Sequence, residues 1–179
     1  EACPNGLAPT TSTTMMMGLG DALAVALLER MGLTPEQFRT FHPGGKLGQK
    51  LKTVGEIMHG LDTLPLIAES ANMGAAILVL SEKNFGCVLV TGKDPRDLKG
   101  IITDGDLKRH MAPDLLQKPV TAVMTTGAKT IMPDALAAEA VNAMTKTPGR
   151  YLTSLIVTDA AGKLAGLIRL QDCLQAGVV

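Results

Sequence analysis

Two stretches of the sequence decide the fold: "LKGIITDGDL" at residues 98–107 and "LAGLIRLQDC" at residues 164–173. Both follow the pattern Leu-x-Gly-hydrophobic-Ile-x-x-x-Asp. Their glycines, Gly100 and Gly166, lie 66 positions apart, and so do the aspartates near their ends. A shared pattern at a fixed distance indicates an internal repeat, which has to be recognised before a fold is predicted.

A second pair of segments lies the same distance apart. The segments "TVGEIMH" (53–59) and "PVTAVMT" (119–125) share the pattern Val-x-x-(Ile/Val)-Met, and Met58 and Met124 are again 66 positions apart. Agreement between two separate anchors argues against chance similarity. We therefore interpret the chain after about residue 50 as two copies of one unit.

Each copy shows the same order of expected elements. The short Met-containing segment comes first, and a helix rich in Ala and Leu follows, with Ser70 or Asp134 near its start as a cap. An apolar run of strand length, a polar turn, a second strand and a helix opened by Asp106 or Asp172 complete the copy. The expected helices are 71–80 and 135–144, the first strands 86–92 and 153–159, and the second strands 100–103 and 166–169.

The repeat determines the expected domain organisation. We place the first copy at residues 51–115 and the second at 116–179, after an unrelated segment at 1–50. A unit of roughly 55–60 residues is small for an independent domain, so the two copies are expected to pack against each other. Helices alternating with strands predict an α/β (α+β) fold class.

The pair resembles tandem cystathionine-β-synthase (CBS) domains. That family carries Gly-hydrophobic-hydrophobic-(Thr/Ser)-x-x-Asp at its last strand-to-helix turn, and residues 100–106 match this motif in full. The resemblance implies that Thr103 and Asp106 contact the phosphate and ribose of a nucleotide. The second copy keeps Asp172 but has Arg169 in place of the hydroxyl residue, which makes it an altered nucleotide-binding half-site.

The chemistry of these residue types agrees with a nucleotide site. At a strand-to-helix turn, the first backbone N–H groups of the helix point toward a bound anion. The Asp106 carboxylate can accept hydrogen bonds from two ribose hydroxyls, and Thr103 can hydrogen-bond a phosphate. Aspartate is also favoured as a helix cap, so a purely structural role for Asp106 and Asp172 stays open.

The segment at residues 1–50 lies outside the repeat. Residues Thr13 to Met31 predict a helix that is apolar on nearly every face, which is typical of a buried helix, and Gly32 is its expected C-cap. A short helix is expected from Thr34 to about Thr40. Because the chain supplies little to bury these helices, we expect residues 1 to about 45 to pack well only when another chain covers them.

The phrases "CPNGLAPTTSTT", "GDALAVALL" and "HPGGKLGQKL" make this segment resemble the end of the sugar-isomerase (SIS) domain of the D-arabinose-5-phosphate isomerases. In that family this region precedes a CBS pair, as it does here. The resemblance implies that His42 is an active-site histidine, and imidazole suits proton transfer because its unperturbed pKa is ~6.5. The phrase around His42 lacks the spacing of a phosphate-binding P-loop.

By the same resemblance, the parent enzyme interconverts D-arabinose 5-phosphate and D-ribulose 5-phosphate through an enediol. This reaction would feed 3-deoxy-D-manno-octulosonate synthesis for lipopolysaccharide or capsule. The family's other catalytic groups lie upstream of this region, so we expect the 179-residue chain alone to be inactive.

Composition argues against several other classes of protein. A formal net charge of zero and an aromatic content of 2% do not suit nucleic-acid binders. The sequence shows no apolar run near ~18 residues, so no membrane span is expected. The scattered Cys3, Cys87 and Cys173 predict reduced, mostly buried thiols in a cytoplasmic protein without a metal site. His59 and His110 match no motif, so solvated or capping roles are expected for them.

The expected ligands are therefore a sugar phosphate and a nucleotide effector, either an adenine nucleotide or a CMP-sugar, with no required cofactor. A homo-oligomer, dimer or tetramer, is expected. Two alternatives stay open: a stand-alone nucleotide-sensing module, and an oligomerisation device without catalysis.

Overall fold

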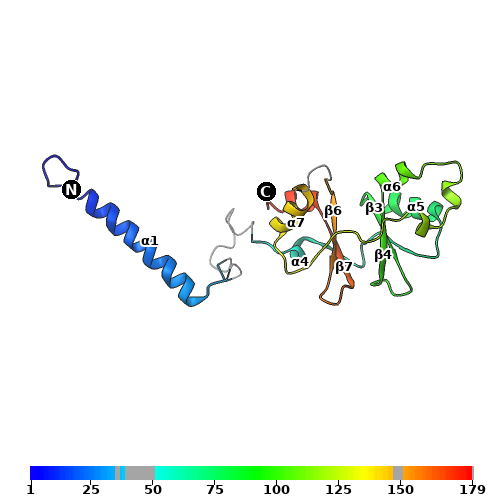
Figure 1. Cartoon of the computed structure of the whole chain (residues 1–179), viewed down its shortest axis with the longest axis horizontal. Helices are drawn as coiled ribbons and strands as arrows, with labels where there is room; N and C mark the ends of the chain where they lie inside the picture. Colours follow the sequence, from blue (N-terminus) through cyan, green and yellow to red (C-terminus); the bar gives the residue numbers. More distant parts are fainter. Residues whose placement is uncertain (35–36, 39–50, 147–150, 179) are drawn as a thin grey trace. The chain divides into compact units, whose positions relative to one another are not determined.

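The computed structural model describes residues 1–34, 37–38, 51–146 and 151–178. The chain divides into two compact units, Glu1–Pro43 and Gly44–Val179. The first contains one long helix, and the second contains both copies of the repeat (Figure 1).

The first unit is dominated by helix α1, Thr11–Met31. It begins two residues before the expected start and ends as expected, with Gly32 in the left-handed conformation at φ 60° and its N–H bonded to carbonyls of the last turn. None of its side chains is buried within the chain, and Met15, Met17 and Met31 are each more than 70% exposed. The short helix expected at 34–40 falls mostly outside the described residues.

Helix α1 is also the one segment among the described residues that is long and apolar enough to cross a membrane, with a mean hydropathy of 1.3. The sequence-based expectation that no apolar segment is long enough to span a membrane is therefore wrong for α1. Asp21 lies near the middle of this helix, and a carboxylate at the centre of a bilayer is costly. Length and composition alone do not distinguish a span from a helix buried inside a protein.

The second unit contains two sheets, and Figure 1 shows helices packed beside each. One sheet has the strand order β2-β3-β4, and the other has the order β1-β7-β6-β5. The strands are β1 His59–Gly60, β2 Leu66–Ala68, β3 Cys87–Thr91, β4 Leu98–Thr103, β5 Thr130–Ile131, β6 Ser154–Thr158 and β7 Leu164–Arg169. The helices are α4 Val54–Ile57, α5 Met73–Lys83, α6 Asp104–Arg109, α7 Ala137–Thr145 and α8 Leu170–Gln175, with short 3-10 helices η1 Leu115–Gln117 and η2 Val120–Ala122.

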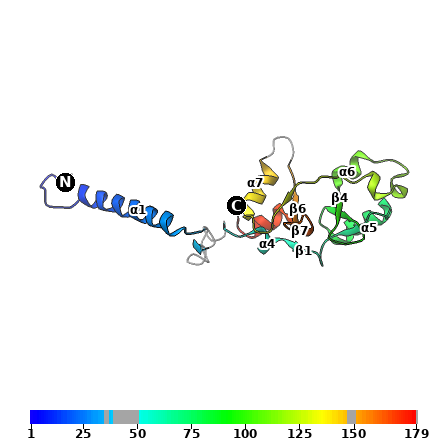
Figure 2. The same ribbon diagram turned by 60° about the horizontal axis from the view of Figure 1, so that its bottom comes forward.

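The two copies exchange their first segments. Strand β1, which precedes the first copy's sheet, pairs antiparallel with β7 of the second copy, with His59 opposite Leu167. Figure 2 shows β1 beside β7, with α4 just before β1 along the chain. Val54 of α4 is accordingly fully buried in the second copy's core, and Val120 of η2 is fully buried in the first copy's core.

The matching glycines of the two copies make this exchange possible. A Cβ on Gly100 would lie 2.8 Å from Sδ of Met124, and a Cβ on Gly166 would lie 2.8 Å from Sδ of Met58. Each glycine therefore leaves room for the methionine that begins the other copy. The two sequence anchors that share the 66-residue offset are therefore in contact crosswise, each glycine with the methionine of the other copy.

The strands expected from the sequence are confirmed, and β3 and β6 are buried along nearly their whole length. The two copies meet through a third cluster of buried side chains contributed by both sheets, so the sheets pack on each other as expected. Its members are Leu64, Cys87, Leu89, Ile156, Leu164 and Leu167.

Two of the expected helix caps are wrong. Helix α5 is capped by Asn72, whose side-chain oxygen accepts a hydrogen bond from the N–H of Ala75 at 3.0 Å, rather than by Ser70. Helix α7 begins after Leu136 rather than at Asp134. In both copies the residue before the helix forms a bridge to the other copy's first segment, which delays the helix start: Asn72 pairs with Pro119, and Leu136 pairs with Thr53.

Candidate functional site

The matched motif lies where β4 runs into α6. Thr103 is the last residue of β4 and the N-cap of α6, and Asp106 is the third residue of that helix. One carboxylate oxygen of Asp106, Oδ2, accepts hydrogen bonds from the Thr103 N–H at 2.8 Å and the Thr103 hydroxyl at 2.6 Å. The structural role left open for this aspartate is thus present, since it closes the first turn of α6.

The other oxygen of Asp106 has partners from further away. Oδ1 accepts a hydrogen bond from the Thr125 hydroxyl at 2.7 Å and another from Nη2 of Arg109 at 2.5 Å. Thr125 arrives on the exchanged segment, where its backbone forms two hydrogen bonds with Ile101 of β4. The Asp106 residue is only 1% exposed because these side chains cover it.

These contacts determine the charge of Asp106. Burial acts to raise its pKa, but hydrogen bonds from the Thr103 and Thr125 hydroxyls, the Thr103 N–H and Arg109 together hold the pKa below its usual value. The group is an anion at neutral pH. It can accept hydrogen bonds but cannot donate one.

The corresponding aspartate of the second copy is paired with an arginine. Asp172 is the third residue of α8, and Arg169 is the N-cap of that helix. The Arg169 guanidinium donates two hydrogen bonds to the Asp172 carboxylate, from Nε to Oδ2 at 2.9 Å and from Nη2 to Oδ1 at 2.7 Å. Such a two-pronged pair is stronger and more rigid than a single contact.

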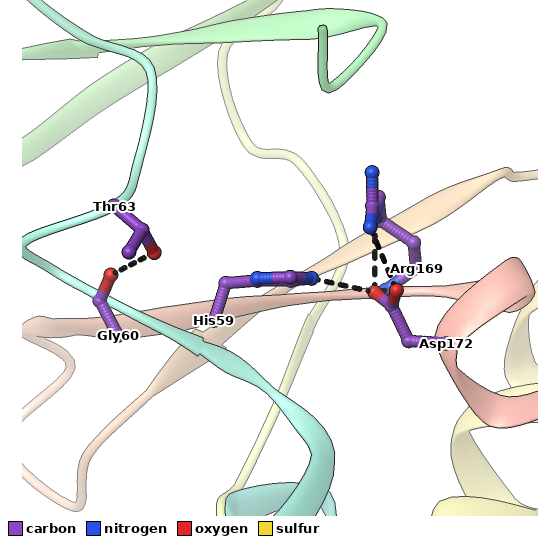
Figure 3. A network of polar contacts seen from close by, with 5 residues as sticks. All are labelled: His59, Gly60, Thr63, Arg169 and Asp172. Carbon is purple, nitrogen blue, oxygen red and sulfur yellow. Dashed lines mark hydrogen bonds and ion pairs between the residues drawn. The ribbon is translucent and has the colours of Figure 1, made fainter. Parts of the chain in front are cut away.

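A histidine and a phenylalanine complete this second cluster. Nε2 of His59, from the exchanged strand β1, lies 3.0 Å from Oδ2 of Asp172, and Figure 3 shows it approaching from a different side than Arg169. The Phe85 ring lies 4.8 Å from the Arg169 guanidinium carbon and edge-on to the His59 ring. The Thr63 hydroxyl, also drawn in Figure 3, donates to the Gly60 carbonyl and closes the turn after β1.

The expectation of a solvated or capping role for His59 is therefore wrong. The 66-residue offset contains the missing signal, because it aligns His59 with Thr125, and each side chain contacts the aspartate of the other copy. For His110 the capping role is confirmed. It is the C-cap of α6, and its Nδ1 lies 2.9 Å from the Asp106 carbonyl oxygen.

Charge in the second cluster is balanced by these contacts. Burial acts to raise the pKa of Asp172, but hydrogen bonding and charge from Arg169, helped by His59, hold that pKa below its usual value. The hydrogen bond to Asp172 in turn raises the pKa of Arg169. Both groups are ionised across the physiological range.

The remaining candidate residues take no part in either cluster. His42 lies outside the described residues. Cys87 and Cys173 are buried and Cys3 is partly exposed, all as free thiols, and burial raises the pKa of Cys87 to about 12. The described part of the chain contains no group of three or more metal-binding side chains placed to hold an ion.

The fold and the two aspartate clusters define a tandem pair of CBS domains. The family model described as "CBS domain" matches residues 54–113 and 120–178, and the chain belongs to this family. Its curated relatives include the arabinose 5-phosphate isomerases KdsD of Escherichia coli K12, at 44% identity, and of Pseudomonas aeruginosa PAO1, at 40% identity. Both alignments cover 100% of this chain but only 54% and 55% of the relatives, so the chain spans about half their length and matches their C-terminal part.

Solved structures share the fold of the pair. The CBS domain of a bacterial CNNM/CorC family Mg2+ transporter in complex with ATP has a TM-score of 0.62 at 20% identity, covering 74% of this chain and 91% of that one. A structure of CBSX2 in complex with AMP has a TM-score of 0.60 at 24% identity, covering 70% of this chain and 96% of that one. At these identities the likeness concerns the fold alone.

Proposed function

We propose that this chain is the regulatory part of an arabinose 5-phosphate isomerase, and that its CBS pair binds a nucleotide effector. The observation that carries the first half is the alignment to KdsD, which extends through residues 1–50 as well as through the repeats. Residues 1–50 would form the end of the isomerase domain, residues 51–115 and 116–179 the two CBS copies. The reaction would interconvert D-arabinose 5-phosphate and D-ribulose 5-phosphate in the cytoplasm, toward lipopolysaccharide or capsule.

His42 would act in proton transfer in the intact enzyme. Moving a proton between two carbons and two oxygens needs at least a base and a second proton carrier held in register, and this chain offers one candidate. We therefore expect the purified 179-residue chain to give no aldose–ketose conversion. A longer protein that includes the region upstream should be active and lose activity on His42→Ala. Measurable turnover by the 179-residue chain would contradict this assignment.

The proposed nucleotide site is the Asp106 cluster. The support is its geometry: a buried anionic carboxylate and a hydroxyl residue lie side by side at the end of β4, where the CBS motif is matched in full. CBSX2, a protein of the same fold, has been solved with AMP. An adenine nucleotide or a CMP-sugar would place its ribose diol on Asp106 and its phosphate near Thr103. Arg169 and Asp172 would form the second, altered half-site.

The two half-sites should differ in binding. Arg169 and His59 already fill the hydrogen-bonding positions of Asp172, so a ligand there has to displace a two-pronged ion pair. We expect Asp106→Ala to weaken nucleotide binding by roughly 10- to 150-fold and Asp172→Ala to weaken it less. Calorimetric titration of both variants with AMP, ATP and a CMP-sugar tests this. Equal losses, or a loss only in Asp172→Ala, would refute the unequal half-sites.

Self-association is the proposal for helix α1. Its many exposed apolar side chains form a surface larger than a soluble monomer normally leaves open. In a homo-oligomer, dimer or tetramer, they would be covered. Light scattering of the chain measures the assembly, and strong hydrogen-exchange protection of α1 in a verified monomer would argue against coverage by another chain.

A further inference from the structure

The two oxygens of the Asp106 carboxylate are not equally available to a ligand. Oδ2 is held by the backbone and hydroxyl of Thr103, three residues away in the same turn. Releasing it would open the first turn of α6. Oδ1 is held by Thr125 and Arg109, both of which are exposed to solvent, so a ligand can approach Oδ1 from this side without opening the turn.

Of these two donors, Arg109 is the one that can leave. Its side chain is 63% exposed, whereas Thr125 is tied to β4 through its backbone. A long solvent-exposed side chain in a single ion pair is weakly held. Its second terminal nitrogen lies over Gly105: a Cβ on Gly105 would be 3.4 Å from Nη1 of Arg109 and 3.6 Å from the Thr103 hydroxyl oxygen.

The guanidinium therefore lies on Asp106 and over the Gly105 backbone, between the two residues that the proposed function assigns to the ligand. A ribose that uses Oδ1 has to displace Arg109 from Asp106. The displaced side chain remains attached to α6, whose N-cap, Thr103, is where the phosphate of the same ligand would lie. A nucleoside has the ribose diol but no anion with which the displaced Arg109 can pair. A nucleotide has both the diol and a phosphate.

Resting on that proposed function, we propose that Arg109 selects phosphorylated ribose ligands by exchanging partners. In the free protein Arg109 pairs with Asp106. In the complex the ribose diol takes Asp106 and the ligand phosphate takes Arg109. Arg109 is thus a specificity-determining residue, which penalises nucleosides and favours nucleotides.

The second copy provides a contrast. Arg169 is 26% exposed, makes two hydrogen bonds to Asp172 and lies against the Phe85 ring, so its guanidinium is held by two partners. The position equivalent to Arg109 in that copy is Gln175, which has no charge. The exchange belongs to the first half-site.

The test is calorimetric titration of adenosine and AMP into the chain and its Arg109→Gln variant. Arg109→Gln should weaken AMP by ~10-fold or more, because a charge-assisted hydrogen bond to phosphate is lost. The same substitution should leave adenosine unchanged or tighten it by up to ~5-fold, because a competitor for Asp106 is removed. Lys108→Gln, the same change of charge at the neighbouring exposed position, should alter the ratio of the two affinities by less than ~2-fold.

The outcomes separate this inference from the function on which it rests. If the unchanged chain binds neither AMP nor a CMP-sugar, the nucleotide function fails and the exchange fails with it. If the unchanged chain binds AMP but Arg109→Gln weakens AMP and adenosine equally, the site stands and the exchange is refuted. Arg109→Lys keeps the positive charge but lacks the paired N–H donors of the guanidinium, and it should retain part of the preference for AMP. An unchanged circular dichroism spectrum of each variant excludes misfolding.

Discussion

Placing a methyl group at Gly100 tests the crosswise contact between the two copies. In Gly100→Ala the new Cβ would lie 2.8 Å from Sδ and 2.9 Å from Cγ of Met124, and 2.9 Å from the backbone oxygen of Thr125. Real Cβ atoms hardly ever approach other atoms so closely. The methionine can rotate away, but the Thr125 oxygen cannot, because it accepts a 3.0 Å hydrogen bond from Ile101.

The expected loss follows from these contacts. Overpacking a buried site by one methyl group costs typically ~1–3 kcal/mol. Replacing glycine also restricts the unfolded chain, which returns ~0.4–1 kcal/mol. The free energy of unfolding should therefore fall by about 1–2 kcal/mol. With a urea slope of ~2 kcal/mol per molar for a unit of this size, the midpoint should drop by ~0.5–1 M.

The assay is urea unfolding followed by circular dichroism, with Gly105→Ala as the matched control. Gly105 lies inside α6, and a Cβ there meets nothing closer than 3.4 Å, so alanine should leave stability unchanged or raise it by up to ~1 kcal/mol. The two substitutions add the same atom, but only Gly100→Ala should lower the free energy of unfolding. A Gly100→Ala midpoint equal to that of the unchanged chain would refute the crosswise packing.

Three further expectations concern the same unit. Arg169→Leu should lower the free energy of unfolding by ~2 kcal/mol, whereas Arg109→Leu, at a side chain 63% exposed, should lower it by less than ~1 kcal/mol. The midpoints of urea unfolding of the two variants measure this difference. Because the pKa of Asp106 is lowered in the folded state, its stabilisation is present above about pH 4 and lost as the pH falls further. The stability difference between the unchanged chain and Asp106→Asn should then shrink from pH 6 to pH 3, and a constant difference would contradict this. A fragment of residues 61–128, which contains all the buried side chains of the first core, should unfold cooperatively, while 51–115, which lacks Val120 and Val123, should not.

The strands can be predicted well from the sequence because each buried strand is a continuous apolar run between polar turns. Cys87–Thr91 and Ser154–Thr158 are of this kind, and the structure has them within one or two residues of the expected bounds. The first residues of the helices are harder to predict from the sequence. Ser70 and Asp134 have the right chemistry for caps, but cross-copy bridges at Asn72 and Leu136 decide where the helices begin.

The exchange of first segments is not visible in the repeat itself. An offset of 66 aligns Met58 with Met124 and Gly100 with Gly166. The offset would be the same if each methionine packed on the glycine of its own copy or on the glycine of the other copy. For this reason the offset shows that His59 and Thr125 occupy equivalent positions, but it does not show which aspartate each of them contacts. His59 is more than a hundred positions from Asp172, and only the pairing of β1 with β7 brings them together.

The exchange also sets an order of events during synthesis. As the chain leaves the ribosome, the first core has all its members once Val123 has emerged. Helix α4 and strand β1 are made earlier but have to wait for β7 and α8 before Val54 can join the core cluster that includes Cys173. The first-made segment of the pair is thus the last to be buried, and its apolar side chains stay exposed to nascent-chain chaperones until β7 and α8 have emerged.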